Sequence, residues 1–249
     1  MSLLNVQNVS IRFGGVDAVR DVSLAVEEQQ LLGFIGPNGA GKTTMMRIIM
    51  GMVRPQQGSV RFRGKDITQW SVHHRVQLGL ALAQQIVKPL HSLTMLDNVA
   101  LAAGARHMRN PLQAFLNIDR SEARNQARKL LDFVGIGNAN DVFPSEVPLG
   151  FIKRMEVARA LALEPWLLLL DEPLAGLNQT EARDLADLIA SLVTPTRSVL
   201  LIEHNIGEVA RICSEIYVQE NGQYLMQDTA ERVMASAALR QAYLGEHKA

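Results

Sequence analysis

The sequence predicts an α/β fold in which buried parallel strands alternate with helices. Three short runs, at residues 31–35, 166–170 and 198–202, are apolar almost throughout, which is typical of central strands in a parallel sheet. The first run leads into a glycine-rich turn and then into a helical pattern at residues 44–52. The other two are followed by polar residues, at the sheet edge where α/β proteins place their ligands.

Additional strands are predicted near both ends of the chain. Val22, Leu24 and Val26 alternate with polar or small residues, and a similar alternation returns at residues 60–63, which is the period of a half-buried strand. Farther along, Asn221-Gly222 separates two short apolar segments, and this dipeptide is typical of a tight hairpin turn.

A helical insertion is predicted between the two halves of the α/β core. Thr94 and Asp97 have the spacing of a helix start, and apolar residues recur at helical spacing from residue 121 to 134, where Gly135 ends the run. We therefore expect one domain over residues 1–249. The expected division is residues 1–85 and 161–249 for the α/β core and residues 86–160 for the helical subdomain.

The composition excludes several classes of protein. Hydrophobic residues make up 47% of the chain, so disorder is not expected, and 25 basic residues balance 25 acidic ones, without the basic excess of a nucleic-acid binder. The single cysteine, Cys213, cannot form an internal disulfide, which favours a reducing cytoplasm. The N-terminus does not resemble a signal peptide, and no apolar run reaches the length of a membrane span, so we expect any membrane role to come through a partner.

A phosphate-binding loop is predicted directly after the strand at 31–35. Its pattern is G-x-x-x-x-G-K-[ST]; the residues expected to bind the nucleotide are Gly36, Asn38, Gly39, Ala40, Gly41, Lys42, Thr43 and Thr44. Glycines let successive N–H groups point at phosphate oxygens, and the helix that follows presents its positive end to the same anion. We expect Lys42 to neutralise phosphate charge and Thr43 to ligate Mg²⁺. The alternative is a glycine turn before an ordinary core helix.

Two acidic residues end the strand at 166–170, and a histidine follows the next strand. We expect Asp171 to hold Mg²⁺ and Glu172 to act as the general base on the attacking water. His204, just past the strand at 198–202, is expected to contact the γ-phosphate or position the water. The alternatives are a solvated acidic turn and a structural or exposed histidine.

These elements, in this order, resemble the ATP-binding cassette of ABC transporters over nearly the whole chain, including its Walker A and Walker B motifs. The resemblance implies a P-loop NTPase (RecA-like) core with an N-terminal antiparallel β subdomain and an inserted α-helical subdomain. Within the family, the chain is most similar to the branched-chain amino acid transport subfamily, whose relatives also move urea or amides. That similarity rests on the P-loop, Ala175-Gly176-Leu177-Asn178, Ile202-Glu203-His204-Asn205 and Ala242-Tyr243-Leu244-Gly245-Glu246.

The resemblance also implies roles for three further residues. Phe13 is similar to the aromatic residue that stacks on adenine, although a core strand residue is the alternative. Gln85 is similar to the residue that reaches Mg²⁺ and the attacking water and links the site to the permease; the neighbouring Gln84 leaves the register open by one. Asn178 is similar to the residue that contacts the partner subunit across the ATP interface.

One segment departs from the family pattern. Family members usually carry Leu-Ser-Gly-Gly-Gln or a close variant before a helix, whereas this chain has Pro148, Leu149, Gly150 and Phe151 in the corresponding signature positions. Proline has neither a hydroxyl nor an N–H to offer the partner's γ-phosphate. We therefore expect one composite ATP site to turn over slowly, which favours a heterodimer over a homodimer. The alternative is that Gly150 and the helix dipole suffice.

The resulting expectation is a transport-coupled ATPase that uses ATP and Mg²⁺ at the cytoplasmic face of the inner membrane. Its expected partners are membrane-spanning permease subunits, a second ABC ATPase and, indirectly, an extracytoplasmic solute-binding protein, with no nucleic acid. The solute is expected to be a branched-chain or hydrophobic amino acid. Alternatives are an ATP-binding coupling module with its chemistry mainly elsewhere, a urea or amide importer ATPase, and a soluble non-transport ABC ATPase.

Overall fold

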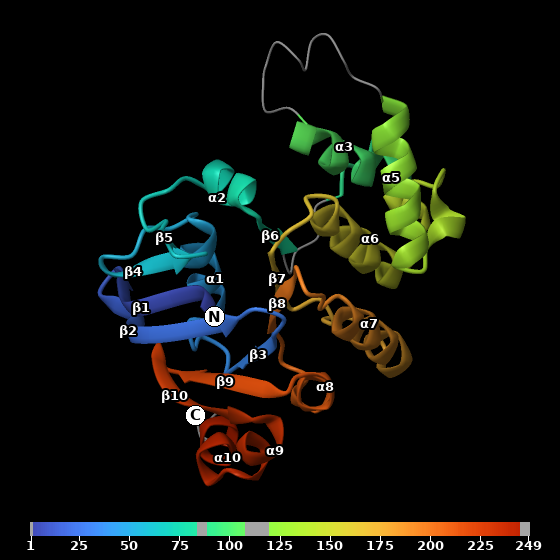
Figure 1. The fold of residues 1–249 in the computed structure, drawn as a ribbon. Coiled ribbons are helices and arrows are strands. Elements are labelled where there is room, and N and C mark those ends of the chain that lie inside the picture. The colour runs from blue at the N-terminus through green and yellow to red at the C-terminus, as the bar shows by residue number, and fades with distance from the viewer. Residues whose placement is uncertain (1, 84–88, 108–119, 245–249) are drawn as a thin grey trace.

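Two β-sheets and a group of helices make up the computed structural model, which describes residues 2–83, 89–107 and 120–244 (Figure 1). The predicted Gln84 and Gln85 and the end of the 242–246 segment lie outside the described residues. No helix in the described part of the chain is long and apolar enough to cross a membrane.

The central sheet has six strands, and five of them run parallel. In spatial order these are β10 (Gln223–Thr229), β9 (Glu215–Glu220), β3 (Leu31–Ile35), β8 (Ser198–Ile202), β7 (Leu167–Asp171) and β6 (Leu80–Ala83). Strand β10 pairs antiparallel with β9, so it forms the hairpin predicted from Asn221-Gly222. Both turn residues have positive φ, 49° and 74°, as a tight hairpin turn requires.

The second sheet is antiparallel and lies at the N-terminal side. Its strands are, in order, β2 (Val16–Glu27), β1 (Ser2–Phe13), β4 (Gln57–Phe62) and β5 (Lys65–Asp66). The space between the two sheets contains α1 (Lys42–Met50), whose apolar side chains share one buried cluster with both sheets. The predicted antiparallel β subdomain is therefore present.

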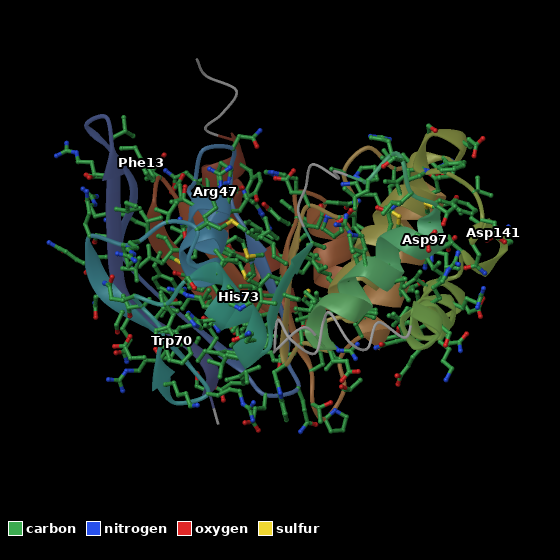
Figure 2. All side chains as sticks on the ribbon, turned by 90° about the horizontal axis from the view of Figure 1, so that it is seen from above. Phe13, Arg47, Trp70, His73, Asp97 and Asp141 are labelled. Carbon is green, nitrogen blue, oxygen red and sulfur yellow. The ribbon has the colours of Figure 1, made fainter. Side chains whose placement is uncertain are left out.

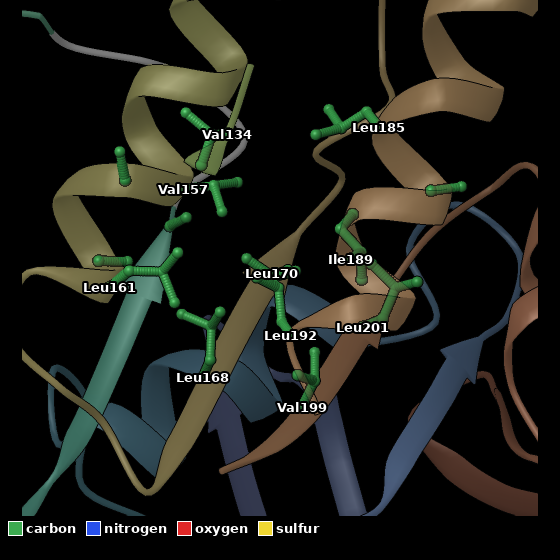
Figure 3. Close-up of a cluster of buried hydrophobic side chains, with 14 of the residues drawn as sticks. Val134, Val157, Leu161, Leu168, Leu170, Leu185, Ile189, Leu192, Val199 and Leu201 are labelled. Atoms are coloured by element: carbon green, nitrogen blue, oxygen red, sulfur yellow. The ribbon is translucent and has the colours of Figure 1, made fainter. Parts of the chain in front are cut away.

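The other face of the central sheet is covered by helices. These are α6 (Leu149–Leu161), α7 (Gln179–Ser191), α8 (Ile206–Ile212), α9 (Ala230–Ala235) and α10 (Ala237–Leu244). Leu168 and Leu170 of β7 point into this second core with Leu161 and Ile189, as Figure 3 shows, whereas Leu167 and Leu169 point toward α1. Because alternate residues of β7 fill two different cores, the strand is apolar throughout.

The helical group extends from one side of the central sheet (Figure 1). It contains α3 (Met95–His107) and α5 (Arg120–Phe133), which pack against each other and against α6. Two short 3₁₀ helices, Gly137–Ala139 and Pro144–Glu146, connect α5 to α6.

Most elements predicted from the sequence appear within about two residues of the expected bounds, the usual precision of such boundaries. The helix expected at 44–52 spans Lys42–Met50 and ends at Gly51, whose φ is 75°. Three short helices, α2 (Val72–Leu78), α9 and α10, were not predicted, because each is too short for a clear apolar stripe.

Candidate functional site

The glycine-rich loop between β3 and α1 requires glycine at two positions. A Cβ at Gly36 would collide with the carbonyl oxygen of Gln219, and a Cβ at Gly41 would collide with that of Ala18. Gly41 also has φ 96° and precedes the first residue of α1. The loop is therefore pressed against β9 and β2, with the N-terminus of α1 directly behind it.

Lys42 folds back onto this loop instead of extending into solvent. Its Nζ donates to the carbonyl oxygens of Gly36 at 2.6 Å and Pro37 at 2.9 Å, and the residue is only 5% exposed. An ammonium held at the loop adds a positive charge to the backbone N–H groups and the helix end. This combination can bind a polyphosphate.

Gln219 of β9, which the sequence did not point to, makes a hydrogen bond that holds the loop in place. The Nε2 of Gln219 donates to the carbonyl oxygen of Ala40 at 2.6 Å, and the N–H of Gly222 donates to the same oxygen at 3.0 Å. The one signal for Gln219 in the sequence is a polar residue after the apolar run of β9.

Asp171 is the last residue of β7 and has the environment of a cation ligand. The residue is 6% exposed, and its Oδ1 is buried without a hydrogen-bond partner among the described residues. Burial raises the pKa of this carboxyl and the neighbouring Glu172 raises it further, while Lys42 opposes the shift. A buried, unpartnered carboxylate oxygen close to a phosphate-binding loop suits Mg²⁺, which combines one or two protein oxygens with substrate phosphates.

Glu172 has a strained backbone and a histidine partner. Its φ is 51°, in the left-handed region that non-glycine residues rarely adopt, and its N–H donates to the carbonyl oxygen of Ile202 at 2.9 Å. Its Oε1 lies 2.6 Å from Nε2 of His204. The structure therefore brings together these two residues, which the sequence predicted on the ends of different strands.

Glu203 was not predicted as a site residue, yet it joins the loops that follow β7 and β8. Its Oε1 accepts from the N–H of Leu174 at 2.6 Å, and its Oε2 accepts from the N–H of His204 at 3.1 Å. The residue is 2% exposed, and burial raises the pKa of its carboxyl to about 7. Glu203 thus fixes the positions of the loops that carry Glu172 and His204.

Lys153, on α6, is a further residue that the sequence did not point to. It is 5% exposed, and its Nζ donates to the carbonyl oxygen of Glu172 at 3.2 Å. Burial lowers the pKa of this ammonium, while Glu203 and then Glu172 oppose that shift.

The unusual signature segment forms the start of α6. Pro148 is the residue before the helix and makes no side-chain cap, Leu149 is exposed, and Gly150 and Phe151 are half-buried. The first N–H groups of any helix have no partner within it, so α6 still offers backbone donors here. Proline adds no hydroxyl to them.

Two other predicted residues, Phe13 and Asn178, make none of the contacts described above. Phe13 is 49% exposed at the end of β1, at the edge of the molecule (Figure 2). The side chain of Asn178 accepts from the N–H of Glu181 at 3.0 Å and so caps α7. Gln85 lies outside the described residues.

The arrangement as a whole combines a polyphosphate-binding loop with a carboxylate–histidine pair at adjacent strand ends. A family model described as "ABC transporter" matches residues 19–175. The chain belongs to the ABC transporter ATP-binding family. As a member of it, this cassette is an ATPase, and ABC ATPases dimerise and work with membrane permease subunits.

Named relatives match this ABC cassette along almost its full length. The lipopolysaccharide export system ATP-binding protein LptB of Haemophilus influenzae is 32% identical over 99% of this chain and 98% of its own. The high-affinity branched-chain amino acid transport ATP-binding protein LivG of Escherichia coli is also 32% identical, over 98% of both chains. The two identities are equal, so identity alone does not separate the two subfamilies.

Solved structures give the same fold. The ADP conformation of MJ1267, an ATP-binding cassette of an ABC transporter, matches with a TM-score of 0.86 and 28% identity over 98% of this chain and 99% of that one. A nucleotide-free ATP-binding cassette from an ABC transporter matches equally well, with a TM-score of 0.86 and 27% identity. The expected α/β P-loop fold is therefore confirmed.

Proposed function

We propose that this cassette drives the transport of a branched-chain or other hydrophobic amino acid through membrane-spanning permease partners. Support comes from the LivG proteins of Escherichia coli and Archaeoglobus fulgidus. Each of them is 32% identical to this chain, and each match covers 98% of this chain. The cassette would sit peripherally at the cytoplasmic face of the membrane, with a solute-binding protein acting on the permease from the other side.

The observation that carries the ATP-hydrolysing part of this proposal is the pairing of Glu172 with His204 at 2.6 Å. Lys42 and the N–H groups of residues 36–44 would bind the phosphates, and Phe13 would stack on adenine. Thr43, Asp171 and Gln85 would hold Mg²⁺, which would neutralise phosphate charge. Glu172 would accept a proton from the attacking water, and His204 would orient that carboxylate.

Two head-to-tail cassettes would complete each ATP site, with the segment 148–151 of one chain facing the phosphates bound by the other. Pro148 removes a hydroxyl donor from that segment, and losing one donor in a dry site costs about 2–4 kcal/mol of transition-state stabilisation. We therefore propose a heterodimer in which the partner cassette supplies an intact signature to this chain's nucleotide. Asn178 would contact that partner, although it also caps α7.

The solute assignment is tested by uptake of radiolabelled leucine into cells whose own copy of this chain is replaced by wild type or by Glu172→Gln. We expect the wild type to restore leucine uptake and the variant to abolish it. If wild-type cells show no leucine uptake that depends on this chain, the amino-acid assignment is wrong. Parallel uptake of urea tests the alternative solute class.

A further inference from the structure

Lys153 is a buried cation among acidic residues that the proposed chemistry leaves unused. It lies in the second turn of α6 and is 5% exposed, with Glu203, Glu172, Glu156 and Asp171 all close enough to favour its charge. Burying an ammonium is costly unless it is paired and hydrogen-bonded. The acidic residues around Lys153 therefore hold its ammonium group in one place.

That position fixes the backbone of the proposed general base. The N–H of Glu172 donates to the carbonyl oxygen of Ile202 in β8 at 2.9 Å. The carbonyl oxygen of Glu172 accepts from Nζ of Lys153 in α6 at 3.2 Å and from the N–H of Ala175 in the following loop at 3.3 Å. These hydrogen bonds hold the residue at φ 51°, a conformation that persists only where the surroundings over-determine it, and α6 supplies one of them.

The same face of α6 also contacts the loop after Glu172. Leu149 and Lys153 are spaced i and i+4, so their side chains project from one face of the helix. Leu149 packs so closely on Gly176 that a Cβ there would lie 2.9 Å from Leu149 Cδ2. The helix that begins with the signature segment therefore contacts the general-base loop at two points.

An open pocket of about 420 Å³ lies beside this face, lined by Leu149, Ile152 and Lys153 of α6 and by Ala175 and Gly176 of the loop. If α6 moved relative to the loop, the hydrogen bond from Lys153 would carry that movement to the backbone of Glu172.

We propose that Lys153 is a positioning residue that links the signature segment at 148–151 to Glu172 of the same chain. The segment faces the nucleotide of the partner cassette, whereas Glu172 serves this chain's own nucleotide. Lys153 thus couples the two composite ATP sites, and its hydrogen bond to the carbonyl oxygen of Glu172 is part of that link. This inference rests on the proposed role of Glu172 as general base.

The test compares the steady-state ATPase kinetics of wild type, Lys153→Met, Lys153→Gln and Lys153→Arg, each assembled with the partner cassette and the permease. We expect Lys153→Met to lower kcat by about tenfold or more, because small misplacements of a catalytic group cost up to ~10²-fold, while KM for ATP changes little. Lys153→Arg, which keeps a charged donor, should recover part of kcat. Lys153→Gln, which keeps a neutral donor, shows whether the hydrogen bond or the charge matters more.

Arg154→Met is the matched control on the same helix. Its NH1 donates to the carbonyl oxygen of Val134 at 2.8 Å, so it ties α6 to the helical group instead of to Glu172. We expect Arg154→Met to lower the melting temperature but to keep the wild-type kcat. Equal losses of kcat in Lys153→Met and Arg154→Met would show a merely structural role and overturn the inference.

A double variant separates this inference from the function on which it rests. In a Glu172→Gln background, Lys153→Met should cause no further loss of residual turnover, because both changes act on one group. If Glu172→Gln alone keeps normal turnover, the proposed general base is wrong. If Glu172→Gln abolishes turnover but all three Lys153 variants keep normal kcat, only the role of Lys153 is wrong.

Discussion

His204 Nε2 and Glu172 Oε1 lie 2.6 Å apart although the two residues are 32 positions apart in sequence. The contact forms because β7 and β8 are parallel neighbours whose carboxyl ends meet at one sheet edge. The His204 side chain is 36% exposed and that of Glu172 11% exposed, so the carboxylate is the more enclosed of the two. The histidine can therefore contact both the carboxylate and a ligand outside it.

Replacing Glu172 with glutamine should stop ATP turnover and leave nucleotide binding intact. The amide has nearly the shape of the carboxylate but cannot accept the proton of the attacking water, and general-base catalysis contributes about 10²–10⁴-fold. Phosphate release and the affinity for a fluorescent ATP analogue measure the two effects. Normal phosphate release from Glu172→Gln would refute the assigned role.

Replacing His204 with alanine should lower kcat more than it changes KM for ATP. The variant leaves the Glu172 carboxylate without its partner at 2.6 Å, so the general base becomes free to adopt other rotamers. We expect a loss of kcat of about 10²-fold, in the range found for mispositioned catalytic groups. His73→Ala, on the exposed surface of α2, is the control and should keep wild-type kinetics.

Glu203 should make the stability of the fold depend on pH. Burial raises the pKa of this carboxyl from 4.5 to about 7, so the folded chain keeps a proton that the unfolded chain loses between these values. Its contribution to stability is therefore fully present below pH 4.5 and falls as pH rises toward 7. The variant Glu203→Gln cannot ionise at this position. From pH 4.5 to pH 7 its free energy of unfolding should therefore fall by roughly 3 kcal/mol less than that of the wild type, at 1.36 kcal/mol per pKa unit.

Urea unfolding of wild type and Glu203→Gln at several pH values measures this difference. The exposed Glu231, on α9, provides the control, because Glu231→Gln should follow the wild-type pH dependence. A constant difference between wild type and Glu203→Gln from pH 5 to pH 8 would contradict a raised pKa for the Glu203 carboxyl.

The sequence predicted those parts of the fold and of the site whose residues are adjacent in the chain. The loop 36–44, the pair Asp171-Glu172 and the hairpin at Asn221-Gly222 each carry their signal within a few positions. Lys153 and Gln219 were missed because their partners are distant, at 19 and 179 positions along the chain. A buried polar residue on a helix or strand shows its partner only after the fold has formed.

Replacing Pro148 with serine should raise ATP turnover in the assembled transporter. Serine restores a hydroxyl at the first position of the signature segment, next to the N-terminus of α6. The lost donor is expected to cost about 2–4 kcal/mol, which corresponds to roughly 30-fold to 10³-fold in the turnover of the affected site. The measurement is made in mixed assemblies in which the partner's own catalytic acid remains intact, so that the repaired site can turn over.

The direct effect of the same substitution should fall on the site that holds the partner's nucleotide, because the other composite site uses the partner's signature. Pairing Pro148→Ser with Glu172→Gln in this chain isolates the repaired site, since its nucleotide belongs to the partner. A rise in turnover in that double variant supports the asymmetric arrangement. No rise would mean that Gly150 and the dipole of α6 already suffice, and that the proline does not distinguish the two sites.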